Sequence, residues 1–327
     1  MEISHYNVIF TTDDWQWPAI TEKNALSKII EFSDLFDDAV YIGFPWATLF
    51  DYLKQNQISK SEKLLSVYQN LKKRINNKKK IITVCQHIHL LKYIKYLEDM
   101  NITDVYWSHC TKEIYDKNLN INFHPFPLFP VKFIESLKNL ENITLEKKYL
   151  ASFLGAKSND LYMKKTRNIL FEKFKNNKNY LVNLNEEWFF QKDVYDHQIF
   201  EKIPENVVKK KNNEPDDYIT TLQNSLFSFC PSGTGPNSIR LWESICFGSI
   251  PIILSDNLKL PGNTNLWENA CIFCKEDDRN IDLLNDRLIS ISNDKEKINF
   301  MINECHKLYL LYGPQIFISD ILMSLGK

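Results

Sequence analysis

Glycine is scarce in this chain, with 8 glycines among 327 residues. Half of them, Gly233, Gly235, Gly248 and Gly262, fall between positions 233 and 262. The N-terminal half has no G-x-G-x-x-G sequence after its first apolar run, so nothing there indicates a dinucleotide site. A residue that is avoided elsewhere is concentrated here for a local reason, and we expect the functional site in this stretch.

The chain has no excess of charge of either sign, because 40 Lys and Arg residues face 41 Asp and Glu residues. This balance gives no signature for nucleic acid or an anionic surface, so we expect no nucleic-acid partner. The sequence also lacks a run of about 18 apolar residues and the basic start and apolar core of a signal peptide. We therefore expect no transmembrane segment and a cytoplasmic location.

Disulfides are not expected either. The 7 cysteines are an odd number and lie mostly in apolar stretches, as Cys85, Cys230 and Cys246 do, which fits reduced core residues. Cys271 and Cys274 form a C-x-x-C pair, but no second pair follows at zinc spacing, so the pair is interpreted as part of a strand. On this basis we expect neither a metal nor a cofactor.

The length of 327 residues, with 44% apolar residues, is sufficient for two domains of about 150 residues each. Apolar strands alternate with helical patterns, which predicts parallel sheets covered on both faces. Pro125, Pro127 and Pro130 interrupt the alternation, which begins again near residue 149. We expect an α/β protein of two Rossmann-like domains facing each other across a cleft. The predicted parts are residues 1–130 for the first domain, 131–148 for a linker, 149–311 for the second domain, and 312–327 for a helix that packs back on the first.

Apolar periodicity places the individual elements. Strands are predicted at residues 6–10, 39–44, 80–85, 104–108, 149–155, 180–184, 226–230, 250–254 and 270–273. Helices are predicted at residues 20–32, 61–75, 88–100, 162–175, 218–224, 280–293 and 295–311, and after the prolines at 45, 130 and 314. Residues 186–216 have a mixed polar composition and are predicted as loop.

Residues 226 to 262 read as strand, glycine loop, helix, glycine turn and strand. The apolar run to Cys230 predicts a buried strand, which the PSGTGP sequence at 231–236 cannot continue. Asn237 and Ser238 are good N-cap residues, so a helix begins where the loop ends. Such a junction can bind phosphate, because backbone amides approach closely and the helix dipole favours an anion. The alternative is an ordinary β-α-β corner without a ligand.

This stretch resembles the exostosin-like glycosyltransferases, which carry C-P-x-G after a strand, then S-x-R-x-x-E, G-x-I-P-V-I, an Asp and Leu-Pro. The resemblance covers mainly residues 149–262. It implies a GT-B fold in which the second domain binds a nucleotide-sugar and the first binds the acceptor. The chain is similar to a compact bacterial or viral member that adds one sugar. The matching residues are Phe229 to Gly233, Ser238, Arg240, Glu243, Gly248 to Ile253, Asp256, Leu260 and Pro261.

Sugar transfer requires a grip on the nucleoside, neutralisation of the departing diphosphate and a base for the acceptor hydroxyl. Arg240 and Glu243 share one helix face and are assigned to the diphosphate and the ribose. Retaining two-domain families carry a second Glu where this chain has Gly235, so inversion is favoured. The predicted donor-binding residues are Gly155, Lys157, Ser232, Gly233, Thr234, Gly235, Asn237, Ser238, Arg240, Glu243 and Asp256.

The base must come from the first domain, from groups that follow its strands. Asp51 is assigned this role because Trp46, Thr48 and Tyr52 accompany it and apolar neighbours would make its carboxylate more basic. Asp14 and His87 are the other catalytic candidates. Structural alternatives are aromatic packing for residues 11–17, a solvated helix face for Asp51 and an interior position for His87. The predicted acceptor-binding residues are Asp13, Trp15, Trp17, Trp46 and Thr48.

The sequence thus predicts an inverting, metal-independent glycosyltransferase that moves one sugar from a nucleotide-sugar, with UDP favoured, to a glycan or glycolipid acceptor. Metal independence rests on the lack of a D-x-D sequence in the second domain, where Asp277 and Asp278 are adjacent. The alternatives are a non-catalytic two-lobed protein that binds sugars or nucleotides, a fucosyltransferase-like enzyme with a GDP-sugar donor, and a sugar-nucleotide epimerase.

Overall fold

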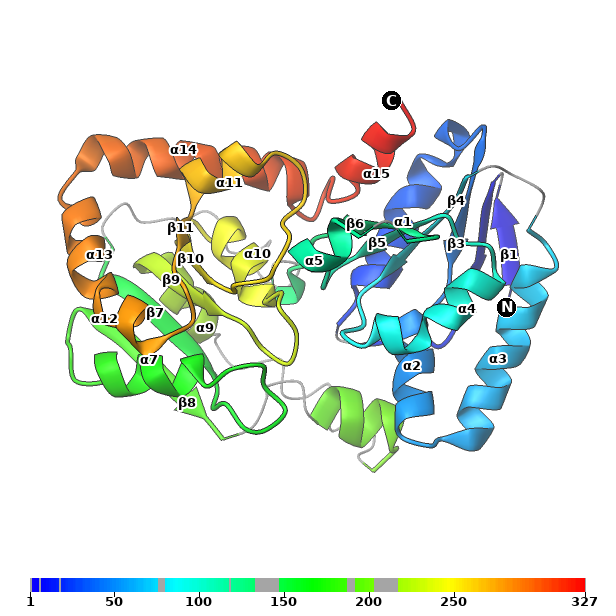
Figure 1. The fold of residues 1–327 in the computed structure, drawn as a ribbon, viewed down its shortest axis with the longest axis horizontal. Coiled ribbons are helices and arrows are strands. Elements are labelled where there is room, and N and C mark those ends of the chain that lie inside the picture. Colours follow the sequence, from blue (N-terminus) through cyan, green and yellow to red (C-terminus); the bar gives the residue numbers. More distant parts are fainter. Residues whose placement is uncertain are drawn as a thin grey trace.

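The computed structural model describes residues 2–5, 7–17, 19–75, 80–117, 119–132, 147–186, 192–202 and 217–326. They form two α/β lobes side by side, with the N-terminal lobe on the right of Figure 1 and the C-terminal lobe on the left. Each lobe is built on one sheet, so the predicted two-lobed α/β architecture is confirmed. Among the described helices, none combines the length and the apolar character that a bilayer crossing requires.

The N-terminal lobe contains a six-stranded sheet whose strands lie in sequence order. β2 to β6 are parallel, and β1 pairs antiparallel with β2 at the edge. The sequence pattern does not predict β1 or β6, because each has only 4 residues, several of them polar. The strands are β1 (Glu2–His5), β2 (Val8–Thr11), β3 (Ala39–Gly43), β4 (Lys80–Cys85), β5 (Asp104–Trp107) and β6 (Asn122–Pro125).

Both faces of this sheet are buried. In β3, Val40 and Ile42 join one core cluster, while Ala39 and Tyr41 join the cluster on the opposite face. The first face is covered by α2, α3, η2 and α4, and the second by α1 and α15. The helices of this lobe are α1 (Thr21–Glu31), η1 (Ser33–Leu35), α2 (Trp46–Lys54), α3 (Ile58–Lys72), η2 (Leu90–Tyr93), α4 (Ile94–Asp99), α5 (Lys112–Tyr115) and α15 (Ser319–Ser324).

The C-terminal lobe contains a five-stranded parallel sheet in the order β11-β10-β9-β7-β8. The chain passes from β7 to β8 and then returns to place β9 on the other side of β7, so the strand order reverses between β7 and β9. Ligands of open parallel sheets bind outside the carboxyl ends of the strands at such a reversal. The strands are β7 (Tyr149–Ala156), β8 (Tyr180–Asn185), β9 (Ser225–Pro231), β10 (Ile250–Leu254) and β11 (Ile272–Phe273).

The predicted order of strand, glycine loop, helix and strand at residues 226–254 is confirmed, with α10 between β9 and β10. α14 runs across the top of the lobe in Figure 1 and packs on α10 and α11. The sequence pattern does not predict α11. The helices are α7 (Thr166–Phe174), α9 (Asp217–Gln223), α10 (Ile239–Cys246), α11 (Thr264–Ala270), α12 (Asp278–Asp282), α13 (Leu284–Ser292) and α14 (Lys295–Tyr312).

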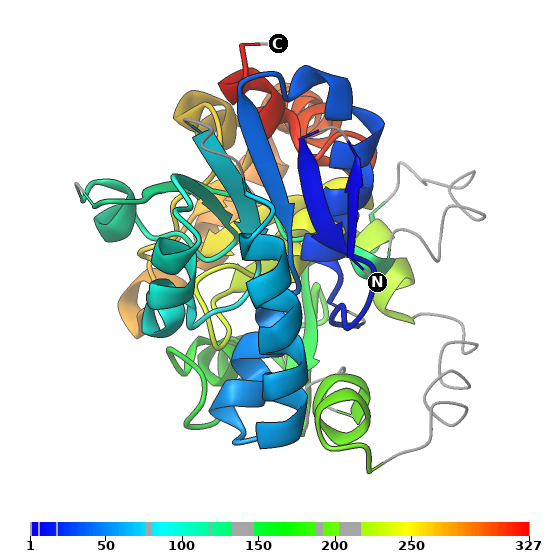
Figure 2. The ribbon, with the colours of Figure 1, turned by 90° about the vertical axis from the view of Figure 1, so that its right-hand side faces the viewer.

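One helical segment of the C-terminal half packs on the N-terminal lobe. η4 (Lys192–Ile199) is a π-helix within the stretch predicted as loop, and Val194 and Ile199 are buried in the core beneath α2 and α3. Lys60 on α3 donates to the Ile199 carbonyl at 2.9 Å. Figure 2 shows η4, in light green, beside the lower ends of α2 and α3. This lobe therefore includes residues beyond the predicted range of 1–130.

The rest of the predicted loop, residues 187–191 and 203–216, lies outside the described residues, as does most of the predicted helix after Pro130. At the other end of the chain, Phe317, Ile318 and Ile321 are buried against the second face of the N-terminal sheet. The last helix thus contacts the first lobe. Both η4 and the last helix pack on the N-terminal lobe because this packing removes their apolar side chains from water, which is favourable.

Candidate functional site

The carboxyl ends of the two sheets meet where the loops after β5 and β9 touch. Asn237 Nδ2 donates to the Ser108 carbonyl at 2.7 Å, and the Asn237 N–H donates to His109 Nδ1 at 3.4 Å. A Cβ atom at Gly235 would lie 2.6 Å from His109 Nδ1 and 2.7 Å from Ile88, so a side chain there would push the lobes apart. The sequence predicts Gly235 and Asn237 as donor ligands, whereas the structure uses both to join the lobes.

Arg240 lies at the strand-order reversal, in the first turn of α10. Its Nη2 donates to the Leu154 carbonyl, and its Cζ lies 4.2 Å from the ring centre of Phe153. A Cβ atom at Gly155 would lie 2.9 Å from Nη2, so glycine leaves room for the guanidinium. Arg240 is 7% exposed, and its Nε has no hydrogen-bond partner among the described residues. An unpaired buried donor costs about 1 to 3 kcal/mol, so this position favours an added acceptor.

A second arginine, which the sequence analysis does not identify, lies beside the first. Arg167 on α7 is 9% exposed and donates to the carbonyls of Ala156 at 3.3 Å and Ser232 at 3.4 Å. Its Cζ lies 4.5 Å from the ring centre of Tyr162. Burial, and then the nearby charge of Arg240, lowers the pKa of Arg167 to about 10. Its guanidinium therefore remains charged at neutral pH.

Arg167 and Arg240, the arginine pair, form an incomplete electrostatic arrangement. In the described part of the chain, neither guanidinium forms an ion pair with a carboxylate, and both use backbone carbonyls as acceptors. The charge of Glu276 acts on Arg167 from nearby, but buried charges without an ion pair are expensive, and an anionic ligand lowers that cost. Guanidinium groups match the oxygens of a phosphate in a bidentate geometry. The arginine pair is therefore suited to bind a diphosphate where the sheet topology predicts a ligand.

The glycine loop between β9 and α10 is held by the protein itself. Glu276 accepts from the Ser232 N–H at 3.1 Å, the Ser232 hydroxyl at 2.7 Å and the Thr166 hydroxyl at 3.1 Å. The Gly233 N–H donates to the Gly235 carbonyl at 2.9 Å. Burial raises the pKa of Glu276. The amides of residues 232 and 233 are thus already used, contrary to the predicted phosphate cradle, and Glu276 is a further site residue that the sequence analysis does not identify.

Two other predicted donor ligands are engaged by the protein. Glu243 is 2% exposed and accepts from the Tyr218 hydroxyl at 2.5 Å, so its ribose role stays a prediction that requires Tyr218 to move. Asp256 accepts from Lys164 at 2.8 Å. Ser238 does not cap α10 with its side chain, which leaves the first turn of that helix without a side-chain acceptor. The predicted donor residues that are at least partly exposed are Gly155, Lys157, Gly233, Thr234, Ser238 and Asp256.

In the N-terminal lobe, Asp51 lies in a buried chain of hydrogen bonds. Its Oδ2 accepts from Gln16 Nε2 at 2.8 Å, and its Oδ1 lies 3.4 Å from His87 Nε2. Gln16 Oε1 accepts from Gln86 Nε2 at 2.8 Å. His87 Nδ1 accepts from the His89 N–H at 3.1 Å, which places the His87 proton on Nε2, toward Asp51. The structure thus brings two of the predicted base candidates into contact and adds Gln16 and Gln86, to which the sequence analysis assigns no role.

The third base candidate, Asp14, lies apart from this chain. It adopts a φ of 63°, and its Oδ2 lies 3.5 Å from Nζ of Lys63 on α3. Asp13 is exposed, and Trp15 is 9% exposed in the core beside α1. Trp17 is 37% exposed and, of the three predicted tryptophans, is the one whose ring is available to a sugar.

Trp46 and Thr48 lie in the core, which corrects their assignment as acceptor ligands. Both are 0% exposed. Trp46 Nε1 donates to the Thr83 hydroxyl at 2.8 Å, and its ring packs edge-on against Phe44 with 4.7 Å between ring centres. α2 starts directly after β3 and lies on the sheet, so its largest ring is buried and not left at the edge.

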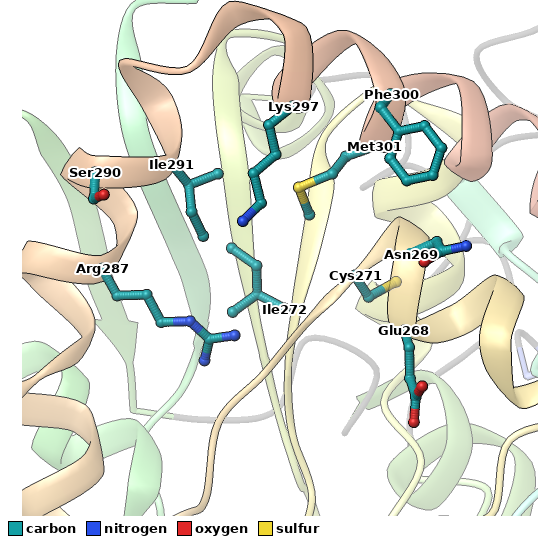
Figure 3. A pocket seen from close by; sticks show the side chains of 10 residues that line it. All are labelled: Glu268, Asn269, Cys271, Ile272, Arg287, Ser290, Ile291, Lys297, Phe300 and Met301. Carbon is teal, nitrogen blue, oxygen red and sulfur yellow. The ribbon is translucent and has the colours of Figure 1, made fainter.

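The described residues contain no group of three His, Cys, Asp or Glu side chains placed to hold a metal ion. All 7 cysteines are free. A cavity of about 370 Å³ lies between β11, α13 and α14 (Figure 3). Lys297 points into it from above Ile272 in the figure, and Arg287 points into it from the left. It borders the edge strand β11, away from the carboxyl ends of β7 and β9, so it is separate from the arginine pair.

The family model of the exostosin GT47 domain matches residues 97–286, which is more than half of the chain. The matched range contains both members of the arginine pair and Glu276, together with the end of the N-terminal lobe that touches the glycine loop.

Curated relatives include a probable glucuronosyltransferase of Oryza sativa subsp. japonica, 37% identical over 122 residues, which are 35% of this chain and 29% of that protein. Probable glucuronosyltransferase 47 A of Physcomitrium patens is 31% identical over 118 residues, 35% of this chain and 26% of that protein. A probable β-1,4-xylosyltransferase of Arabidopsis thaliana is 34% identical over 82 residues, 24% of this chain and 20% of that protein. The match spans less than a third of the length of each relative.

Solved structures with a related chain path include an alpha-glucosyltransferase in complex with UDP and a 13-mer DNA containing a central A:G mismatch. Its TM-score is 0.48 at 14% identity, over 98% of this chain and 90% of that chain. A glycosyltransferase from Rickettsia africae has a TM-score of 0.45 at 12% identity, over 97% of this chain and 84% of that chain.

Proposed function

The chain belongs to the exostosin GT47 family, and on that premise we propose that it is a metal-independent, inverting glycosyltransferase with a UDP-sugar donor. The observation that carries the proposal is the arginine pair, buried beside the strand-order reversal without an ion-paired carboxylate in the described residues. A nucleoside diphosphate supplies the missing negative charge. Because its relatives are named as probable glucuronosyl- and xylosyltransferases, glucuronosyl and xylosyl groups are the first sugars to test.

The proposed transfer is one displacement. The acceptor hydroxyl of a glycan or glycolipid gives its proton to the Asp51–His87 pair, with Asp51 as the base, and its oxygen forms a bond to the anomeric carbon. The bond from that carbon to the β-phosphate oxygen breaks on the opposite face, and its electron pair leaves with UDP. Attack opposite to the leaving group inverts the anomeric centre.

The two lobes divide this work. The guanidiniums of Arg167 and Arg240 neutralise the negative charge that grows on the departing diphosphate. In other transferases a bound metal ion neutralises this charge. The exposed ring of Trp17 offers a stacking face for the acceptor sugar. Contact between the lobes at Gly235 and His109 brings the ends of both sheets together.

A panel of UDP-, GDP-, CMP- and TDP-sugars tests the proposal by thermal shift, followed by an assay of UDP release with glycan acceptors. A ligand at a hundred times its dissociation constant stabilises the fold by about 2.7 kcal/mol. We expect UDP and UDP-sugars to raise Tm and UDP to be released when an acceptor is present. Stabilisation by a GDP-sugar alone would favour the fucosyltransferase-like alternative. Binding without release for any acceptor would favour a non-catalytic protein.

A further inference from the structure

The amide of Gln16 has one orientation that satisfies its neighbours. The Asp51 carboxylate only accepts hydrogen bonds, so Gln16 donates to it with Nε2 at 2.8 Å. Its Oε1 then faces Gln86, which donates with Nε2 at 2.8 Å, while Gln86 Oε1 accepts from the Glu22 N–H at 3.1 Å. Gln86 Nε2 also donates to the Ala19 carbonyl at 2.7 Å. Each amide fixes the orientation of the next, so the donor that faces Asp51 is held in place.

The backbone on both sides of Gln16 is held by η4. Gln198 Nε2 donates to the Trp15 carbonyl at 2.9 Å, and Gln198 Oε1 accepts from the Trp17 N–H at 3.0 Å. The side chain of Gln198 thus forms hydrogen bonds with both peptide groups that flank Gln16. Because Val194 and Ile199 anchor η4 in the N-terminal core, these hydrogen bonds hold Gln16 to the same lobe as Asp51.

We propose that Gln16 is a positioning residue for the base and that Gln198 keeps Gln16 in place. This inference rests on the proposed function, in which Asp51 takes the acceptor proton. Gln16 occupies Oδ2 of Asp51 and thereby leaves Oδ1 toward His87. A hydrogen bond donated to a carboxylate favours its ionised form, which is the form that can accept a proton. Gln198 does not contact Asp51 and acts through the peptide groups beside Gln16.

Ionisable side chains surround Asp51, whereas Gln16 donates a hydrogen bond to it from an amide that does not ionise. Removing the Gln16 amide therefore withdraws a hydrogen bond without withdrawing a charge, whereas a carboxylate at position 16 adds one. The ionisable groups around Asp51 are Glu22 on α1, His87 and His89 after β4, Tyr93 on η2, and Tyr195 on η4.

The first test compares Gln16→Glu with Gln16→Ala. Two carboxylates in contact resist being ionised together, so Gln16→Glu should move the acid limb of the kcat profile up by about one to three pH units. Gln16→Ala should lower kcat about tenfold or more and leave the donor KM within about twofold. An acid limb that stays in place in Gln16→Glu would overturn the inference.

A measurement that does not require turnover accompanies this test. The imidazole of His87 can be followed by NMR as the pH changes, in the parent and in Gln16→Glu. We expect its titration midpoint to move to higher pH in the variant, because an added negative charge beside Asp51 favours the imidazolium. An unchanged midpoint in a folded variant would contradict the proposed contact.

The second test separates Gln198 from the segment that carries it. Gln198→Ala should lower kcat in the same direction as Gln16→Ala but by a smaller factor. Lys60→Ala is the matched control, because Lys60 tethers the same segment through the Ile199 carbonyl and Glu201 without touching residues 15–17. We expect the control to keep the parental kcat and pH profile. Equal losses in both variants would assign the effect to the segment and remove Gln198 from the proposal.

Failure of the inference and failure of the proposed function give different results. If Asp51→Asn keeps the parental kcat, Asp51 is not the base and the assignment under the proposed function is refuted. If Asp51→Asn loses activity while Gln16→Glu leaves the acid limb and the His87 titration in place, only the positioning role of Gln16 is refuted.

Discussion

The two sides of the inter-lobe site are equally buried but differently satisfied. In the C-terminal lobe, Arg167 and Arg240 are 9% and 7% exposed and have carbonyl acceptors but, within the described residues, no ion-paired carboxylate. In the N-terminal lobe, Asp51 and His87 are 2% and 6% exposed, and each is hydrogen-bonded to a neighbour. Unmatched buried charge indicates a ligand of opposite sign, whereas a closed network indicates a group held in one orientation. Burial alone would not distinguish the proposed binding side from the proposed catalytic side.

The largest effect that we expect is on turnover, from the acceptor side. Asp51→Asn should lower kcat by about 10² to 10⁴-fold, because a general base contributes that much, and should leave UDP affinity nearly unchanged. Steady-state kinetics and calorimetry with UDP measure the two quantities. His87→Ala should also lower kcat. Asp14→Asn is the control, since Asp14 pairs with Lys63 outside the network, and a collapse of kcat in this variant would move the base to Asp14.

The next effect is on donor affinity, from the C-terminal side. Arg167→Ala and Arg240→Ala should each weaken UDP binding about tenfold or more, because a hydrogen bond to a charged group contributes about 1.5 to 3 kcal/mol. Calorimetric titration measures the loss. Arg279→Ala on α12 removes an exposed arginine and should bind UDP like the parent. If both site variants bound UDP with parental affinity, the donor would bind elsewhere, and the arginine pair would not mark a binding side.

A smaller effect concerns stability where the sides meet. Burial, and then the nearby His87, lowers the pKa of His109 from 6.5 to about 3. The unfolded chain therefore binds this proton first as the pH falls, and stability is lost from pH 6.5 downward toward pH 3. Between pH 7 and pH 5 the loss from this one group is about 2 kcal/mol.

Denaturant unfolding of the parent and of His109→Gln at the two pH values measures this loss. The amide introduced by His109→Gln keeps an oxygen that can accept the Asn237 N–H but does not titrate, so the variant should lose less stability on acidification than the parent. His306→Gln, at an exposed position on α14, should behave as the parent does. The same pH dependence in all three proteins would show that His109 is not kept neutral by the contact.

The smallest expected effect is that of chelation. Because the guanidiniums of the arginine pair are proposed to neutralise the diphosphate, we expect turnover in EDTA to equal turnover without it. Loss of activity in EDTA that Mn²⁺ or Mg²⁺ restores would contradict this. It would also mean that the C-terminal side needs an additional cation beside its arginines.

The sequence alone predicts those elements whose structure depends on local interactions. β9, the glycine loop, α10 and β10 follow from an apolar run, a stretch that cannot remain extended and good helix signals, and Arg240 follows from its place in that order. The same reasoning cannot identify Arg167, because an arginine in a basic helix looks like a solvated residue until the fold places it beside Phe153 and Arg240. The position of Arg167 beside Arg240, on a different helix, depends on the fold and not on the local sequence.

Tertiary contacts also explain the differences in the N-terminal lobe. Gln16 and Gln86 are ordinary polar residues in the sequence, and only the contacts of Gln16 with Asp51 and of Gln86 with Gln16 make them part of a network. The sequence predicts Trp46 as an acceptor-binding residue, but the apolar area of its ring favours the core. η4 has a mixed polar sequence, so its burial on α2 depends on a partner surface that no local pattern shows.

The crossings of η4 and α15 have a consequence for synthesis. The core of the N-terminal lobe includes Val194, Ile199, Phe317 and Ile321, which leave the ribosome long after the strands that they cover. The core of the C-terminal lobe is drawn from residues between 151 and 312, a range that is interrupted only by η4 among the described residues. The lobe that is translated first is therefore completed last, and its sheet has to wait for side chains that are still to be made.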